Sequence, residues 1–282
     1  MPVEQIISGL GDEGNSTKTI FYPSIKMSSY LFAWSIGEFE YVERIVGNMP
    51  LRVYTQPKQS SKLKFTLDVA CKVVEFLSNN TQMALPLPKL DLMAIPNFIG
   101  GMKDFGLIMF HEYALFSQET DCLSDKRVNA ILIAHEIAHQ WFGDLVTCQW
   151  WDTIYLNEGF ATLFGDYVID KLYPCWKVWT EHFYPQIYLG ALELDAKDNQ
   201  THPIEMSVRK ADDAKFMFDF ITYNKAAAVL RMVQKKIGEE RFQIGIQNYL
   251  KKHSFSNVTS ADLYQALVEI SGLDELPIMM KQ

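Results

Sequence analysis

The sequence predicts an α+β fold, in which a small β-sheet is followed by a mainly helical part. Short runs rich in β-branched and aromatic residues occur up to about residue 110, and Pro86, Pro88 and Pro96 interrupt them. From Ser124 onward, apolar residues recur at the spacing of helices instead. A chain of 282 residues can bury roughly three quarters of its unfolded surface, which is enough for a large core.

The strands of this sheet are predicted in the first 110 residues. Residues 19–43 alternate in polarity and are rich in Ile, Phe, Tyr, Val and Ser, which predicts two or three strands. Leu51–Thr55, Leu90–Ile95 and Leu107–Phe110 are further short strands. Within residues 65–77, apolar side chains recur at the spacing of one helical face, so we expect a helix between two of the strands.

The second half of the chain is predicted to form a series of helices. Asn129–Phe142 is a long apolar run that ends at Gly143, as a buried helix with a C-terminal stop would. Asn157–Phe164 begins a second helical stretch. Three more helices are predicted near residues 224–237, 239–253 and 260–271. Thr259 or Ser260 would cap the last of them.

The first two of these helices carry residues with the spacing of a metal site. His135 and His139 are four residues apart, so a helix presents both imidazoles on one face. Glu158 follows on the next helix, after eighteen intervening residues. Two neutral imidazoles and one carboxylate are the ligands of a zinc ion whose fourth position is left for water. The sequence therefore predicts one Zn²⁺ per chain, in a site suited to hydrolysis.

Glu136 lies beside the predicted ligands without competing with them. It follows His135 directly and projects roughly 100° further round the helix, so it flanks the metal position. A carboxylate placed there is the natural general base for a zinc-bound water. The alternative is a charge that faces solvent, but Glu136 lies inside an apolar run. An H-E-x-x-H motif can also arise by chance; here the two surrounding helices favour the metal site.

These segments resemble a known family. His135–Thr147, Trp150–Asp152 and Leu156–Ala161 are similar to the signature of the gluzincin aminopeptidases, the family of aminopeptidase N and puromycin-sensitive aminopeptidase. Thr222–Met232 is similar to the segment that carries the catalytic tyrosine of that family. The resemblance extends from about residue 19 to about residue 272, which is nearly the whole chain.

The resemblance implies a fold, a substrate class and a further catalytic residue. Residues 51–282 would form a thermolysin-like catalytic domain, and residues 1–50 would be the remnant of an N-terminal β-domain, with the chain truncated at both ends relative to the family. Its substrates would be peptides. Tyr223 would stabilise the oxyanion, although spacing alone would fit a packing tyrosine at a helix edge as well.

One stretch departs from the family pattern. Family members carry G-A-M-E-N or G-G-M-E-N, whose backbone holds the substrate and whose Glu binds its α-amino group. The corresponding residues here are Gly100, Gly101, Met102, Lys103 and Asp104. The two glycines suit the close approach of a substrate strand. Lys103 instead puts a cation where an ammonium should be bound, unless it snorkels away and leaves Asp104 as an imperfect substitute.

Composition excludes several classes of protein. The net charge of −8, without a stripe of Lys or Arg, argues against a nucleic-acid partner. No apolar stretch has the length of a membrane span, and no secretory signal is visible. The four cysteines are widely spaced and predict reduced thiols rather than a disulfide or metal pattern. We therefore expect a cytoplasmic protein; its oligomeric state is not predicted.

Three functions are compatible with these features. The first is a zinc metallopeptidase that removes N-terminal residues from peptides, with weakened or altered recognition of the amine. The second is a catalytically weak paralogue that acts as a peptide-binding module, which Lys103 and the length of the chain favour. The third keeps hydrolysis but changes its class, to an endopeptidase or a hydrolase of another small substrate. The preserved set of ligands, base and tyrosine favours the first.

Overall fold

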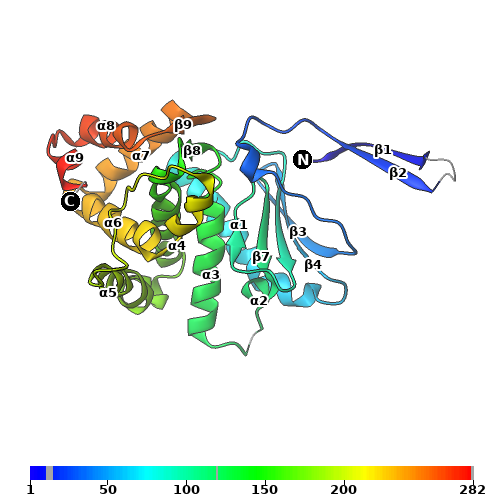
Figure 1. The fold of residues 1–282 in the computed structure, drawn as a ribbon. Coiled ribbons are helices and arrows are strands. Elements are labelled where there is room, and N and C mark those ends of the chain that lie inside the picture. Colours follow the sequence, from blue (N-terminus) through cyan, green and yellow to red (C-terminus); the bar gives the residue numbers. More distant parts are fainter. Residues whose placement is uncertain (11–14, 119, 281–282) are drawn as a thin grey trace.

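The computed structural model describes residues 1–10, 15–118 and 120–280 (Figure 1). The described chain begins with an antiparallel hairpin of β1 (Val3–Leu10) and β2 (Ser16–Phe21), which extends away from the rest of the molecule. Nearly all of its side chains are exposed. The remainder consists of a sheet region and a helical region, in that order along the sequence.

The sheet has five strands in the order β3-β4-β5-β7-β6. Its strands are β3 (Glu40–Val46), β4 (Met49–Thr55), β5 (Leu90–Ile95), β6 (Gly101–Met102) and β7 (Leu107–His111). β4, β5 and β7 are parallel, whereas β3 and β6 lie antiparallel at the two edges. The three strands predicted after residue 50 are therefore confirmed, and the short edge strand β6 contains part of the predicted substrate-binding stretch.

Helix α1 (Lys64–Thr81) connects β4 to β5 and covers the sheet. Val69, Val73 and Leu77 on its inner face are completely buried. Burying a side chain of this size stabilises the fold by roughly 1.5–3 kcal/mol. The helix ends at Gln82, whose left-handed backbone has φ 54°. The helical stripe predicted within residues 65–77 is thus confirmed.

The helical region surrounds two long central helices, α3 (Leu123–Ala138) and α4 (Tyr155–Leu172), which pack closely against each other. The other helices are α2 (Glu112–Leu115), α5 (Leu189–Asp195), α6 (Ala226–Ile237), α7 (Glu239–His253), α8 (Ser260–Ser271) and α9 (Leu276–Met279). Thr259 caps α8 in a capping box with Asp262, so of the two predicted caps the threonine is the correct one. The mixture of a small sheet and many helices confirms the predicted α+β class.

Several details differ from the prediction. Residues 22–39, all of them described, contain no strand, so the prediction of two or three strands over residues 19–43 is only partly correct. Helix α3 begins earlier than predicted and ends at Ala138, four residues before Phe142. A short parallel pair of β8 (Val146–Cys148) and β9 (Ser256–Val258) was not predicted. Residue 50 lies within β4, which pairs with β3 in one hairpin, so the proposed division into residues 1–50 and 51–282 falls inside a strand.

Two π-helical segments also interrupt the helical region, at Trp179–Tyr188 and at Ile221–Lys225. The second is directly continuous with α6 and contains Tyr223. Such segments often occur at functional sites, because they redirect side chains relative to a regular helix. Within the described residues, no helix combines the length and the apolar character needed to cross a membrane.

Candidate metal centre

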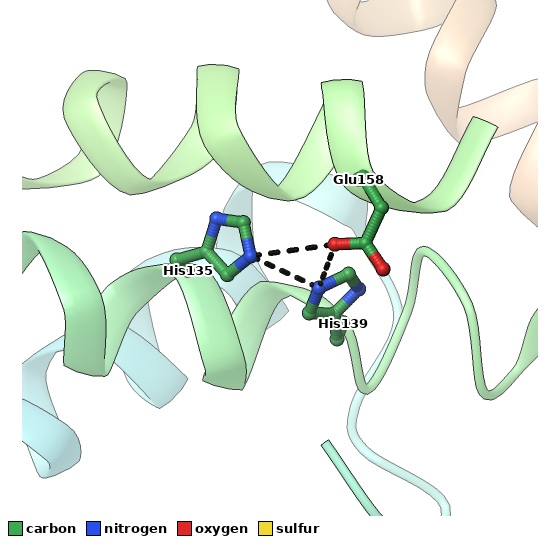
Figure 2. Close-up of side chains that lie close together, drawn as sticks. All are labelled: His135, His139 and Glu158. Carbon is green, nitrogen blue, oxygen red and sulfur yellow. Dashed lines mark hydrogen bonds and ion pairs between the residues drawn. The ribbon is translucent and has the colours of Figure 1, made fainter. Parts of the chain in front are cut away.

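The three predicted ligands lie together between α3 and α4 (Figure 2). His135 belongs to the last turn of α3, and His139 is the residue at which that helix ends. Glu158 comes from the first turn of α4 and points toward both imidazoles. Within the described residues, these three form the one group of three or more His, Cys, Asp or Glu side chains that could hold a metal ion.

The distances between the ligand atoms suit a single small cation. Nε2 of His139 is 3.1 Å from Nε2 of His135 and 3.0 Å from Oε2 of Glu158, and the His135–Glu158 distance is 3.6 Å. Tetrahedral zinc with bonds of about 2.0–2.1 Å separates its ligand atoms by about 3.3 Å. Oε2 of Glu158 is also buried and has no hydrogen-bond partner. An orphan carboxylate oxygen that faces two imidazole nitrogens fits a metal ligand.

The imidazole of His139 is oriented by its other nitrogen. Nδ1 lies 2.9 Å from the carbonyl oxygen of Phe142, which can only accept a hydrogen bond, so Nδ1 carries the proton and Nε2 keeps its lone pair. Gly143 makes this arrangement possible. Its φ of +134° disfavours other residues, and a Cβ atom there would lie only 3.2 Å from Nδ1 of His139. His135 has a weaker contact, 3.5 Å from its Nδ1 to the hydroxyl of Thr162.

The charges at the site are those that metal binding requires. Burial lowers the pKa of His139, which keeps the imidazole neutral although the nearby Glu158 acts in the opposite direction. Burial alone would raise the pKa of Glu158, but Lys103 and His139 outweigh it and hold that pKa well below its usual range. A neutral imidazole beside an ionised carboxylate is the donor set that zinc binds.

Glu136 lies beside strand β6. It is buried, and its Oε2 atom has no hydrogen-bond partner. The strand approaches so closely that a Cβ atom on Gly101 would lie 2.8 Å from Cγ of Glu136 and 2.6 Å from its Cδ. A larger residue here would require the Glu136 side chain to shift, so the glycine permits this close contact. The contact places the candidate base at the start of the predicted substrate-binding stretch.

The side chain of Tyr223 packs against that of His135. Its ring is stacked on the imidazole of His135, with 6.0 Å between ring centroids and 5° between the planes. Burial, with the nearby charges of Glu158 and Glu136, raises its pKa far above the ordinary value. The phenol therefore stays protonated and able to donate a hydrogen bond.

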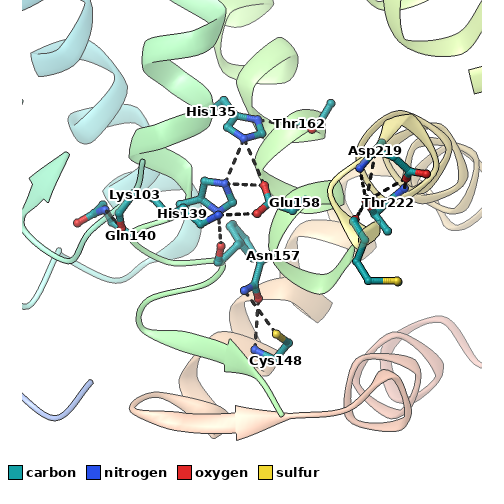
Figure 3. Close-up of polar contacts among 12 residues, drawn as sticks. Lys103, His135, His139, Gln140, Cys148, Asn157, Glu158, Thr162, Asp219 and Thr222 are labelled. Carbon is teal, nitrogen blue, oxygen red and sulfur yellow. Dashed lines mark hydrogen bonds and ion pairs between the residues drawn. The ribbon is translucent and has the colours of Figure 1, made fainter. Parts of the chain in front are cut away.

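The π-helical turn that carries Tyr223 is held by a small polar network (Figure 3). The carboxylate of Asp219 accepts hydrogen bonds from the backbone nitrogens of Ile221 at 2.9 Å and Thr222 at 3.1 Å. Its other oxygen lies 2.8 Å from Nε2 of His202. The hydroxyl of Thr222 donates to the carbonyl of Met217. The turn that carries the tyrosine is thus held mainly by Asp219 and its partner His202, which lie outside the recognised motif.

Lys103 makes the most unexpected contact in the site. Its Nζ atom lies 2.5 Å from Oε1 of Glu158, and the two side chains are 7% and 0% exposed. The lysine therefore does not snorkel to solvent, which was one of the two possibilities that the sequence left open. Burial would lower its pKa, but the charges of Glu158 and Glu136 outweigh this effect and raise it, so Lys103 is a cation.

Gln140 attaches the loop after β6 to the end of α3. Its side chain accepts a hydrogen bond from the backbone nitrogen of Gly106 at 3.0 Å. It donates to the carbonyl of Lys103 at 3.4 Å and to the carboxylate of Asp144 at 2.8 Å. Asp144 therefore contacts Gln140 rather than a ligand imidazole. Burial raises the pKa of Asp144 well above its usual range.

The other predicted substrate-binding residues lie close to this loop. Gly100 precedes β6 with φ 70°, and Met102 pairs with Met109 of β7. Asp104 is buried, and its Oδ2 atom has no hydrogen-bond partner. Burial raises its pKa to about 7, although the positive charge of Lys103 opposes the shift.

Besides Asp219 and His202, three further contributors to the site were not recognised in the sequence. Thr162 could have been found, since it follows Glu158 by one helical turn and must share its face. The contact of His139 with Phe142 could not be predicted from residue type, because it uses the backbone carbonyl, which every residue has. Phe218, whose ring lies 5.6 Å from Nζ of Lys103, is one of three alternating phenylalanines with Phe216 and Phe220, and this pattern does not single it out.

Comparisons with known proteins agree with this geometry. Residues 65–282, well over half of the chain, match the model of the peptidase family M1 domain. Aminopeptidase M1-C of Oryza sativa subsp. japonica is 43% identical over 260 residues, which are 90% of this chain and 29% of that protein. Leucyl aminopeptidase of Saccharolobus solfataricus is 41% identical over 256 residues, which are 90% of this chain and 32% of that protein. Glutamyl aminopeptidase of Bitis rhinoceros is 40% identical over 276 residues, which are 96% of this chain and 28% of that protein.

The chain spans about a third of the length of these relatives. Within that span, the match includes both helices that carry the candidate ligands and the segment that carries Tyr223. The family model and the relatives, each above 30% identity over nearly the whole chain, lead to one conclusion. This chain belongs to the peptidase M1 family.

Proposed function

We propose that this chain is a zinc-dependent peptidase that removes N-terminal residues from peptides. The observation that carries this proposal is the convergence of two imidazole nitrogens and an unpartnered, buried carboxylate oxygen from His135, His139 and Glu158. A site built only for structure would close all four positions of the metal with protein ligands. Three ligands leave the fourth for water, as hydrolysis requires.

Glu136 is the proposed general base. A zinc ion held by the three ligands would lower the pKa of its bound water to about 7. The carboxylate of Glu136 is buried beside the ligands, with one oxygen free to accept a proton. It would then deliver that proton to the leaving amine, so that a single side chain serves as base and acid in turn.

Tyr223 is the proposed donor to the oxyanion. Its phenol is protonated, is held next to His135, and lies in a turn fixed by Asp219. A donor aimed at charge that develops only in the transition state raises the rate without tightening the binding of the substrate.

The substrate is proposed to lie along β6. This strand is the edge of the sheet, so one side of its backbone is available to pair with an extended peptide. Gly101 brings the strand against Glu136, which would place the scissile bond beside the base. The leucyl and glutamyl names of two relatives differ, so we propose no preferred N-terminal residue. The cytoplasmic location stays a prediction from composition.

A pair of matched substrates tests the proposal. A dipeptide with a free α-amine and its N-acetylated twin are incubated with the zinc-loaded chain, with the chain after treatment with a chelator, and after zinc is restored. We expect the free dipeptide to be cleaved, weakly, and the cleavage to disappear and return with zinc. Equal cleavage of the acetylated twin would indicate a different class of hydrolase.

A second candidate function is supported by one specific contact. The ion pair between Lys103 and Glu158 engages a proposed ligand with a protein cation, as expected for a chain that binds peptides but hydrolyses them poorly. If a full equivalent of zinc is bound and neither dipeptide is cleaved, the peptide-binding module is the better description.

A further inference from the structure

We propose that Lys103 is a positioning residue for the metal ligand Glu158: it occupies one oxygen of that carboxylate and weakens zinc binding, while it stabilises the metal-free site. The inference rests on the proposed zinc site. It concerns a residue at which this chain departs from the family motif, and it gives that residue a role distinct from recognition of the substrate.

The two oxygens of Glu158 have different neighbours. Oε1 lies 2.5 Å from Nζ of Lys103, whereas Oε2 has no hydrogen-bond partner and lies 3.0 Å from Nε2 of His139. Because the ammonium already occupies Oε1, Glu158 can offer only Oε2 to a metal. Lys103 therefore fixes the carboxylate as a ligand through a single oxygen.

Lys103 is held in this position by its surroundings. Its carbonyl accepts a hydrogen bond from Gln140, and its ammonium lies 5.6 Å from the centre of the Phe218 ring. The whole residue is 6% exposed. Moving the ammonium away from Glu158 would leave a buried charge without a partner, which is strongly unfavourable.

The positive charge of Lys103 determines whether it raises or lowers the affinity of the site for zinc. A side chain behind a histidine ligand usually accepts a hydrogen bond from that ligand and makes it a better electron donor. A cation has the opposite effect, because it attracts the electron density of the carboxylate and repels the dication through a poorly screened interior. Lys103 also orders Glu158, which favours binding, but two positive charges on one carboxylate outweigh this contribution.

The same contact stabilises the chain when no metal is bound. Glu158 is completely buried and negatively charged, and Lys103 supplies its principal counter-charge. The metal-free chain therefore keeps the carboxylate in place, and zinc adds less to its stability than it would in a chain without this lysine.

The test replaces Lys103 with a neutral residue of similar length. For Lys103→Met we expect the Kd for zinc, measured by competition with a fluorescent chelating indicator, to fall at least tenfold. We also expect its Tm in the presence of a chelator to fall, so that the rise in Tm on adding zinc is larger than for the unmodified chain. Neither readout depends on hydrolysis.

Lys89 provides a matched control. It is also a buried lysine, but its Nζ atom contacts Asp91 at 2.7 Å and the carbonyl oxygen of Gly106 instead of a proposed ligand. Lys89→Met should lower Tm by a similar amount with and without zinc and leave the Kd for zinc unchanged. If Lys103→Met does not fold without metal, Lys103→Gln refolded in the presence of zinc gives the same comparison of Kd.

The outcomes separate the two proposals. Tighter zinc binding by Lys103→Met or Lys103→Gln, with no change in Lys89→Met, supports the inference. If the Lys103 variants bind zinc with the same Kd as the unmodified chain, or more weakly, the inference is wrong while the zinc site stands. If neither the unmodified chain nor any variant binds zinc, the proposed function fails together with it.

Discussion

The two halves of the candidate site differ in how they are built. His135, His139 and Glu158 come from two helices that pack directly on each other, and each side chain is aimed by the regular geometry of its helix. The stretch from Gly100 to Asp104 is instead a short edge strand and a loop, held mainly by contacts with distant residues. The first half follows the family signature, and the second departs from it at Lys103.

This difference shows how the lysine at position 103, in the loop, can affect the metal ligands on the helices, which themselves match the family signature. From the sequence, Lys103 was expected to face the amine of a substrate. In the structure its ammonium lies on a proposed metal ligand. Removing one partner of a buried ion pair typically costs about 3–5 kcal/mol, so Lys103 and Glu158 are strongly coupled. We therefore expect Lys103 to affect the metal site as well as recognition of the substrate.

The largest effect is expected in the helical half, at Glu136. In Glu136→Gln the amide cannot accept a proton from a zinc-bound water, so turnover should fall by roughly 10³-fold or more while zinc remains bound. Steady-state kinetics and metal analysis of the same preparation measure both quantities. If the variant keeps more than a tenth of the activity, another group is the base.

A smaller loss is expected at Tyr223, which joins the helical half through its stacking on His135. Tyr223→Phe removes only the hydroxyl, so kcat should fall by roughly 10²-fold with little change in KM. A pure packing role for the tyrosine predicts little change in kcat or KM, because the phenylalanine ring would keep its packing contacts. Measuring kcat and KM separately distinguishes the two roles.

How well each half could be predicted from the sequence depends on how far apart in the sequence its contacting residues are. The spacing of His135 and His139 is local, so the sequence alone places both on one face. The partner of Lys103 is 55 residues away, and no local pattern records that contact. The contact between Gly101 and Glu136 likewise depends on how the sheet packs against α3. The sequence therefore identified Gly101 as a substrate-binding residue but could not show that it lies against Glu136.

The N-terminal strands were hard to predict for a different reason. Val3–Leu10 is exposed almost throughout, so no buried face imposes an alternation of polarity on it. Phe32, Trp34 and Ile36 do alternate, but they are exposed and lie in a segment without strands. Alternation predicts a strand only where a neighbouring strand is available to pair with it.

The smallest effect is expected in the loop half. Lys103→Glu replaces a cation with a carboxylate, which gives a substrate ammonium a negative partner instead of a competitor. With zinc in excess, kcat/KM for a free-amine substrate should rise about tenfold, mainly through a lower KM, whereas an N-acetylated substrate should gain little. If the free-amine substrate gains nothing, the charge at residue 103 does not reach the amine.

The zinc content of the purified chain tests the central claim most directly. If His135, His139 and Glu158 together hold the metal, the unmodified chain binds one equivalent of zinc and His139→Ala retains almost none under the same conditions. Elemental analysis after dialysis, with circular dichroism to verify that the variant is folded, gives the answer. A folded His139→Ala variant that still holds a full equivalent of zinc would contradict the proposed ligand set.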